Sequence, residues 1–324
     1  MPKREMVTVD LVPVAGSRFQ PTGFPDLGAG LFKRWHNGEW EECLLVESAQ
    51  SMANHLEASA WDRGASAPVP AMAALPYVRV AGADGAFLAS SRTEAHRLAS
   101  AFVKDSVVDG VGMRAVIKDR LGLADDTPLA PRQIAAALFR LDPMCLVHGV
   151  FFAEPATVWP GQPKVARALT GFVEAHGVMP AVSGGVKRDE VRHQISEGAG
   201  GAAEGYGSVP FHRTEYVAKG IQTAFALDLD QLASYGLPAV AADLLAGAAR
   251  FEIRSLLDRG LRLRTACDLV PADTSQVDAQ LPPLDHLIAD LDRLSRECAA
   301  LWDDPPVLEV VWRPEAGKKK VKGA

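Results

Sequence analysis

One stretch, residues 47–57, constrains the fold most, because it separates into two faces when it is wound as a helix. Its apolar stripe predicts contact with a core: Leu45, Ala49, Met52, Ala53 and Leu56. Its other side carries hydrogen-bonding groups: Gln50, Ser51, Asn54, His55 and Glu57. That side has one carboxylate and no lysine. It therefore favours contact with a shaped polar ligand, and an ordinary hydrated surface helix is the alternative.

The chain supplies enough apolar residues for a sizeable core. It has 324 residues, of which 48% are hydrophobic, so either one elaborated domain or two ordinary ones can form. No run approaches the roughly 20 apolar residues that cross a bilayer, and no signal-peptide core follows the N-terminus. We therefore expect a globular protein of the cytoplasm.

The cysteines and histidines form no local metal or redox motif. None of the four cysteines belongs to a C-x-x-C pair, so each is expected to be a small buried residue. They are Cys43, Cys145, Cys267 and Cys298. The eight histidines show neither H-E-x-x-H nor H-x-H spacing. We expect no metal and no cofactor, and a site assembled from distant residues is the remaining alternative.

The net charge of −6 is unevenly distributed along the chain. Residues 267–310 hold ten acidic residues against two arginines, a local net charge of −8, which leaves +2 for the rest. An acidic C-terminal module thus accompanies a mildly basic body. Such a body is compatible with a nucleic-acid partner.

The first ninety residues mix strand patterns with loops. Residues 7–12 alternate in polarity and predict an opening strand. Two prolines, two glycines and two phenylalanines at 17–28 predict an ordered loop, and 42–46 predict a second strand or the lead-in to the helix. Residues 62–90 are rich in Ala, Pro and Gly and predict an insertion or a flexible lobe. Its strand-like pieces are residues 77–80 and 86–88.

A second polar helix is predicted at residues 91–100. Ser91 and Glu94 have the spacing of a capping box. Arg92, His96 and Arg97 would then form a cationic patch suited to phosphates, or simply a solvated face.

The rest of the chain alternates further helices and strands. In order, the patterns predict a helix at 127–141, a central strand at 144–152, a helix at 161–174, a strand pair or one long strand at 216–230, a helix at 239–257, a strand at 261–270, a helix at 284–301 and a closing strand at 307–312. Arg262 and Arg264 share one face of the strand at 261–270 and could form an RNA platform. No internal repeat is visible. The order fits an α+β sheet domain with large insertions better than a doubly wound nucleotide-binding fold.

A glycine-rich segment at residues 183–213 has basic residues near both of its ends. No strand leads into G-x-x-x-x-G-K-[ST], so the segment is not a phosphate-binding loop of that kind. It predicts an extended loop or hairpin that a partner orders, or a plain surface loop. The basic residues near its ends include Lys187, Arg188, His212 and Arg213.

Five sequence stretches occur together and in one order. They are RFQPTGFPDLG at 18–28, ESAQSMANHLE at 47–57, SRTEAHR at 91–97, ARAL at 166–169 and RLRT at 262–265. Their combination resembles the type I-U (also called I-G) CRISPR backbone subunit, of the Cas-seven group of repeat-associated (RAMP) proteins. The resemblance runs from about residue 18 to about residue 270, and no single stretch is specific alone.

The resemblance implies a fold and a function. The fold would be a modified RNA-recognition-motif (ferredoxin-like) palm with finger and thumb insertions, forming one domain over 1–312. Within it, 62–90 would be the insertion or finger, 183–213 the thumb-like loop and 271–312 the acidic C-terminal helix and strand. Residues 313–324 would be a disordered basic tail.

The implied subunit is a scaffold without catalytic activity. Several copies would line up along the CRISPR guide RNA in a helical array, beside other subunits of the effector complex, and target DNA would bind through the guide. The K/R-G-F/Y-G/A-F-V-x-F/Y signature of RNA-recognition motifs is missing, so contacts with the RNA backbone are expected in place of base stacking. Such contacts leave base edges free to pair with any target.

The polar residues of these segments are the candidate RNA contacts. They are Arg18, Gln20, Lys33, Arg34, Gln50, Ser51, Asn54, His55, Ser91, Arg92, His96, Arg97, Lys164, Arg167, Lys187, Arg188, His212, Arg213, Arg262 and Arg264. Glu57 would repel phosphate, and we expect it to face an arginine or to cap a neighbouring element.

Two other functions are consistent with the sequence. A metal-dependent ribonuclease would use Asp10, Asp26 or His212, although neither aspartate has a second carboxylate close by in sequence. A protein-only assembly module would use the polar helix and the glycine-rich segment for subunit contacts.

Overall fold

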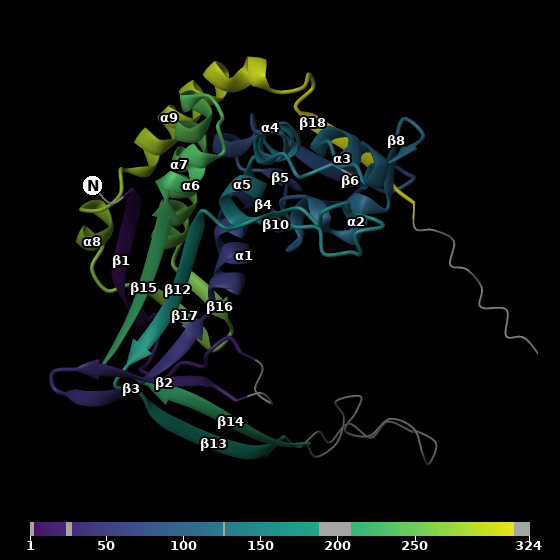
Figure 1. The fold of residues 1–324 in the computed structure, drawn as a ribbon. Coiled ribbons are helices and arrows are strands. Elements are labelled where there is room, and N and C mark those ends of the chain that lie inside the picture. Colours follow the sequence, from purple (N-terminus) through teal and green to yellow (C-terminus); the bar gives the residue numbers. More distant parts are fainter. Residues whose placement is uncertain (1–2, 24–27, 126, 188–208, 314–324) are drawn as a thin grey trace, which may run out of the picture.

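The computed structural model describes residues 3–23, 28–125, 127–187 and 209–313 (Figure 1). Within these ranges, no helix combines the length and apolar character that a membrane span requires. The structure is of the α+β class: a curled sheet carries helices on one face, and a second, smaller sheet lies beside it.

A seven-stranded antiparallel sheet organises the molecule, in the order β16-β17-β1-β15-β12-β3-β2. Its strands are β1 (Arg4–Pro13), β2 (Gly30–His36), β3 (Glu39–Glu47), β12 (Leu169–His176), β15 (Gly220–Asp228), β16 (Leu261–Arg264) and β17 (Cys267–Pro271). Burial alternates strictly along β12 and β15, as expected when one face of a sheet packs on a core and the other does not.

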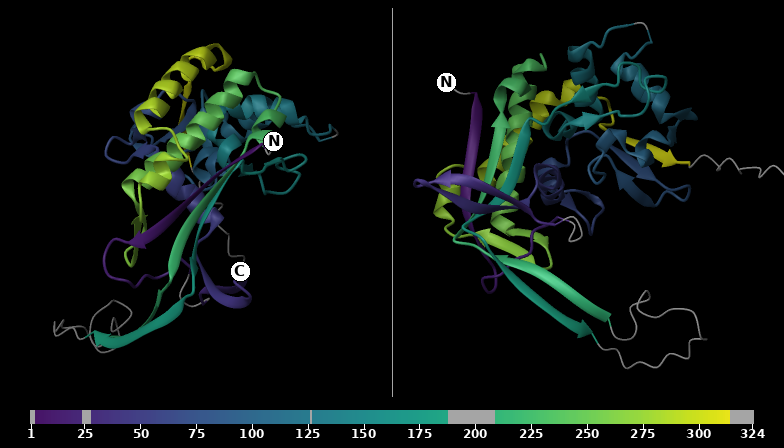
Figure 2. Two further views of the ribbon diagram at one scale, coloured as in Figure 1. Left: turned by 90° about the vertical axis from the view of Figure 1, so that its left-hand side faces the viewer. Right: turned by 60° about the horizontal axis from the view of Figure 1, so that its bottom comes forward.

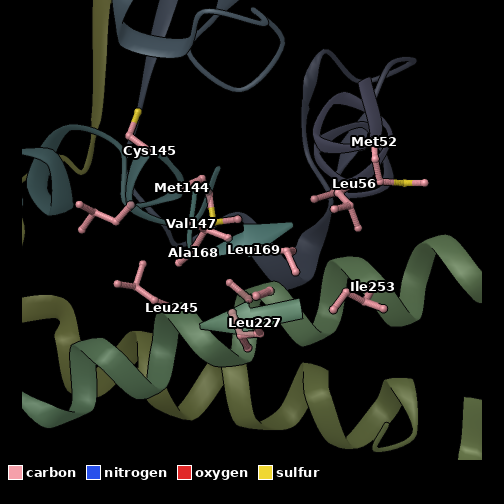
Figure 3. Close-up of a cluster of buried hydrophobic side chains, with 14 of the residues drawn as sticks. Met52, Leu56, Met144, Cys145, Val147, Ala168, Leu169, Leu227, Leu245 and Ile253 are labelled. Atoms are coloured by element: carbon pink, nitrogen blue, oxygen red, sulfur yellow. The ribbon is translucent and has the colours of Figure 1, made fainter. Parts of the chain in front are cut away.

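Helices α1 (Ala49–Ser59) and α7 (Ala239–Arg259) cover the apolar face. Figure 3 shows Met52 and Leu56 of α1 with Leu169 of β12, Leu227 of β15 and Ile253 of α7 in one buried cluster. Helix α9 (Leu284–Cys298) packs along the other side of α7. The acidic C-terminal segment is therefore held against the main core.

The second sheet pairs the closing strand with strands from residues 77–112, in the order β7-β6-β18-β8-β9. Its strands are β6 (Tyr77–Ala81), β7 (Phe87–Ser90), β8 (Ser106–Val108), β9 (Val111–Gly112) and β18 (Val307–Trp312). The closing strand β18 pairs in parallel with β6, whose Val78 and Val80 are fully buried. The 62–90 segment is thus an ordered part of the second sheet, and its interpretation as a flexible lobe is wrong.

Shorter elements complete the fold. They are β4 (Trp61–Asp62), β5 (Ala67–Pro68), the 3-10 turns Pro70–Met72, Arg97–Ala99 and Ala299–Leu301, α2 (Ala101–Lys104), α3 (Met113–Leu121), α4 (Pro131–Leu141), α5 (Met144–His148), β10 (Val150–Phe151), β11 (Lys164–Val165), α6 (Leu229–Ser234) and α8 (Ser275–Asp278).

The hairpin of β13 (Met179–Lys187) and β14 (Val209–Val217) projects from the sheet, as both views of Figure 2 show. The two ends of the glycine-rich segment therefore form a hairpin, one of the two structures predicted for it. Residues 188–208, with Arg188, lie outside the described residues, as does the tail at 314–324.

Most predicted elements after residue 127 are present, and three of those predictions are wrong. The strand predicted at 144–152 is helix α5 followed by β10, and the helix predicted at 161–174 is β11 and β12. In β12 every second residue, at 169, 171, 173 and 175, faces the core, as expected for a strand. Pairing with β3 on one side and β15 on the other holds this segment in the strand conformation. The strand predicted at 261–270 turns back on itself between β16 and β17.

Candidate nucleic-acid interface

Helix α1 presents its polar side away from the core. It begins after Ser48, whose Oγ accepts a hydrogen bond from the Ser51 backbone N–H at 3.3 Å. Gln50 and Asn54 are exposed, whereas Ser51 and His55 are half-buried. His55 Nε2 lies 3.4 Å from a carboxylate oxygen of buried Glu47, so this histidine is directed at the sheet.

A cleft of about 520 Å³ opens beside the last two turns of α1. Its walls come from α1, the β4–β5 turn, β7 and the segment after β7: Asn54, Glu57, Ala58, Trp61, Arg63, Ser66, Phe87, Leu88, Arg92, Thr93, Glu94 and Ala95. Asn54 and Glu57, on the polar side of α1, therefore meet residues 92–95 of the segment SRTEAHR in this cleft. Gln50, Ser51 and His55 do not line it.

Glu57, at the inner end of this cleft, is bound by Arg97. Arg97 Nε and Nη2 donate to the two carboxylate oxygens at 2.7 and 2.8 Å, and both side chains are about 95% buried. Arg97 Nη1 also donates to the Gly149 carbonyl at 3.1 Å. The expectation that Glu57 faces an arginine is confirmed, and its charge is neutralised in place.

Burial acts on both members of this pair. Burial raises the pKa of Glu57. Burial lowers the pKa of Arg97, but the attraction of Glu57 outweighs it, so the pKa of Arg97 is raised. The bidentate geometry favours the charged pair, because a protonated Glu57 would point its proton at a guanidinium donor.

Ser91 and Arg92 belong to a second buried network. Ser91 Oγ donates to Asp142 at 2.6 Å, and Arg92 Nε lies 2.7 Å from the same carboxylate while Nη2 donates to the Pro76 carbonyl at 3.0 Å. Residues 91–100 form turns and one 3-10 turn, so the predicted helix, its capping box and its exposed cationic patch are wrong. Ser91, Arg92 and Arg97 join segments of the core, and His96 alone of that patch is exposed.

A third buried pair was not expected from the sequence. His148 Nε2 of α5 lies 2.7 Å from Glu252 of α7, and both side chains are almost fully buried. The Ser59 hydroxyl, at the end of α1, contacts the Glu252 carbonyl at 3.2 Å. No local spacing announces such a pair, because His148 and Glu252 are 104 residues apart.

Arg167 has no such partner. Its Nε is buried and without a hydrogen-bond partner among the described residues. Burial, and secondarily the nearby charge of Arg97, lowers its pKa, while Glu57 acts in the opposite direction. Lys164 is exposed, and its Nζ lies 5.5 Å from the centroid of the Phe151 ring.

The other candidate contacts lie on or beside the β2–β3, β13–β14 and β16–β17 hairpins. Arg18 and Arg213 both approach the buried Glu215, at 3.1 and 3.6 Å. Arg34 is paired with Glu41 at 2.8 Å. The remaining ones are exposed Lys33 and Arg262, half-buried Gln20, and Arg264, which donates to the Pro21 carbonyl. The side chains of Lys187 and His212 lie outside what the structure describes.

Of the residues considered for a nuclease, the structure describes the side chain of Asp10. Asp10 accepts hydrogen bonds from Gln222 and Gln276, and Asp26 is outside the described ranges. In the described part of the chain, no three His, Cys, Asp or Glu side chains cluster as metal ligands. All four cysteines are buried, as expected.

One of three comparisons with known proteins supports the resemblance. The search of curated proteins found no match. A chain of the solved structure "CRISPR RNA-guided surveillance complex, pre-nicking" is similar over 86% of this chain and 72% of that chain, with 15% identity and a TM-score of 0.36. The family model described as CRISPR-associated protein GSU0053 matches residues 6–180, more than half of the sequence. The chain therefore belongs to the family of CRISPR-associated protein GSU0053.

Proposed function

We propose that this protein is a non-catalytic, guide-RNA-binding backbone subunit of a type I-U/I-G CRISPR surveillance complex in the cytoplasm. Several copies line up along the guide RNA and hold it by its backbone for pairing with target DNA. Family membership supports the association with CRISPR. The RNA-binding role is supported by the fold and by the charges around α1.

The arrangement of the sheet supports a modified RNA-recognition-motif palm. The elements β1, α1, β12, β15, α7 and β17 follow each other in the order β-α-β-β-α-β. Their strands lie side by side as β17-β1-β15-β12, all neighbours antiparallel, which is the arrangement of a ferredoxin-like sheet. The remaining strands then extend or decorate this palm.

The open face of the sheet is a poor surface for RNA. Asp10, Gln222 and Glu174 lie next to each other across β1, β15 and β12 on this face. Two carboxylates here repel phosphate, and the adjacent row, with Thr8 and Ala224, contains one aromatic residue, Phe172. RNA is therefore expected on the α1 side, in contrast to RNA-recognition motifs that stack bases on the sheet.

The observation that carries this proposal is the charge balance beside α1. Arg97 neutralises Glu57, so the exposed amides of Gln50 and Asn54 lie next to no free carboxylate of their own helix. Arg167 lies two residues before β12, the strand on which α1 packs, and its Nε has no hydrogen-bond partner among the described residues. Neutral donors on α1 and a cation at the end of the neighbouring strand suit ribose and phosphate groups, which every sequence shares.

The test compares RNA affinities of matched variants. Arg167→Ala removes a charge-assisted contact worth about 1.5–3 kcal/mol, so a guide-length RNA should bind at least about tenfold more weakly. The slope of log affinity against log salt should also fall by about 0.7, the value for one single-stranded phosphate contact. Gln50→Ala with Asn54→Ala should weaken binding with little change in slope, because neither side chain is charged.

Arg140→Ala is the control, because this arginine is exposed on α4, outside the cleft. It should bind RNA like the unaltered protein. If Arg167→Ala also binds RNA with unchanged affinity and slope, the assignment of the RNA path to the α1 side of the sheet fails.

A further inference from the structure

A pair of exposed tryptophans marks the tip of the β2–β3 hairpin. The turn residues Asn37 and Gly38 both have positive φ, 50° and 86°, as a two-residue type I′ turn requires. Trp35 and Trp40 lie directly opposite each other, with ring centroids 5.5 Å apart and ring planes at 73°. Cross-strand stacking stabilises the hairpin, yet the side chains remain 62% and 65% exposed.

This surface is suited to a protein partner. Exposed Leu31 lies on the same face of β2 as Trp35, because it is four positions earlier and every second residue of a strand shares a face. The nearby charges are balanced: Lys33 is opposite Glu42, and Arg34 is paired with Glu41. Phosphate would find no net positive potential here, whereas buried tryptophans are the commonest anchors of protein interfaces.

A cleft of about 600 Å³ lies at the far side of the molecule, between α2, α3 and β18. Its lining is Ala101, Phe102, Asp105, Arg114, Glu154, Val158 and Trp312. The Phe102 and Trp312 rings are 5.3 Å apart, and Phe102 is 38% exposed. The indole N–H of Trp159 already donates to Glu154 at 2.6 Å, so carboxylates at this site do accept indole donors.

We propose that the Trp35–Trp40 tip of one copy docks into the Phe102–Trp312 cleft of the next copy. The β2–β3 hairpin and the elements that line the cleft, α2, α3 and β18, lie at opposite ends of the molecule in Figure 1, so the tip of one copy cannot reach its own cleft. A contact between two different surfaces is heterologous, and its repetition gives an open array. The inference rests on the proposed array along the guide RNA and names a protein contact that would build it.

The two surfaces are complementary in shape and chemistry. The tip is convex and aromatic, and the cleft has the volume of an ordinary small-molecule pocket with an aromatic wall. Arg114 is held inside the cleft by ion pairs with Asp105 and Glu154. Its hydrogen bonds to Asp105 use only Oδ1, so the second carboxylate oxygen of Asp105 can accept an indole N–H from the tip.

The test uses two variants that each lose one surface. Trp35→Ala with Trp40→Ala removes the tip, and Ala101→Trp fills the cleft from an exposed position. Sedimentation is measured on the full chain without RNA, up to about 1 mM, because contacts of this small size bind in the micromolar to millimolar range. Ile288→Ala, at an exposed apolar position of α9, is the matched control.

Three results are expected together. The unaltered protein and the control should grow in average mass with concentration, each variant alone should remain monomeric, and an equimolar mixture of the two variants should stop at a dimer. A monomeric unaltered protein at every concentration overturns the proposal, and so do variants that assemble like the control. A mixture that stays monomeric overturns it as well. If Ala101→Trp dimerises by itself while the tip variant does not, the hairpins pair with each other, which also overturns the proposal. RNA is absent, so these outcomes are independent of the RNA-binding test.

Discussion

Removing Arg97 should destabilise the fold far more than removing a surface arginine. Its guanidinium makes two hydrogen bonds to Glu57 at 2.7 and 2.8 Å and a third to the Gly149 carbonyl at 3.1 Å. Arg97→Met leaves the Glu57 carboxylate almost fully buried without its partner. Breaking a buried pair in this way costs about 3–5 kcal/mol. An exposed pair, in contrast, contributes about 1 kcal/mol or less.

Urea denaturation at pH 7 measures this cost. With a slope of about 3 kcal/mol per M, the upper end for small proteins, the midpoint should fall by about 1–2 M in Arg97→Met and in Glu57→Leu. The double variant should lose much less than the sum, because no buried charge remains. Arg140→Ala should change the midpoint by less than about 0.2 M.

The loss in Arg97→Met should also depend on pH. Burial raises the pKa of Glu57, and removing Arg97 removes an attraction that lowers it. A carboxyl whose folded pKa lies above its unfolded value destabilises the fold at higher pH, and this penalty disappears below the unfolded pKa. The variant should therefore approach the unaltered protein in stability as the pH falls toward about 4.5. A midpoint shift below about 0.3 M at pH 7 would refute this account of the pair.

Three further predictions follow from buried groups and close contacts. Burial opposes ionisation of Glu154, but hydrogen bonds from Arg114, Trp159 and Lys104 outweigh it and hold the pKa at about 2. The free energy of unfolding should therefore fall as the pH is lowered from 4.5 to 2, and it should fall less in Glu154→Gln. Burial raises the pKa of Cys267 to about 12 and that of Cys298 to about 11, so an alkylating reagent at pH 8 should label them only after urea unfolding, as mass spectrometry can show. Gly171→Ala would place a methyl group 2.4 Å from a β15 phenylalanine ring and should lower the unfolding temperature, whereas Gly247→Ala, with its nearest neighbour at 3.6 Å inside α7, should raise stability by about 0.5–1 kcal/mol.

Helix α1 was predictable from sequence because its two faces differ over three turns. Met52 and Leu56 are buried and Gln50 and Asn54 are exposed, as the pattern indicates. The direction of Glu57 toward an arginine was predictable from electrostatics alone. The choice of Arg97 as its partner was not, because forty residues and a second sheet separate them.

The errors have physical causes. The stretch that forms α5 reads as a strand because it is buried on all sides, and periodicity cannot separate a buried helix from a buried strand. Residues 161–174 contain apolar positions at helical spacing, yet pairing of β12 with β3 and β15 decides the outcome. Arg92 and Arg97 resemble a surface patch, because a sequence does not show the distant carboxylates Asp142 and Glu57 that bury them.

The most direct test of the central claim is to sequence the RNA that co-purifies with the protein after co-expression with a CRISPR array and the other subunits of the complex. We expect guide RNAs from every spacer of the array in similar proportion, because contacts with the backbone do not depend on base sequence. These RNAs should be depleted in Arg167→Ala and retained in Arg140→Ala. Protein that carries no RNA, or cellular RNA without enrichment of guides, would contradict the account.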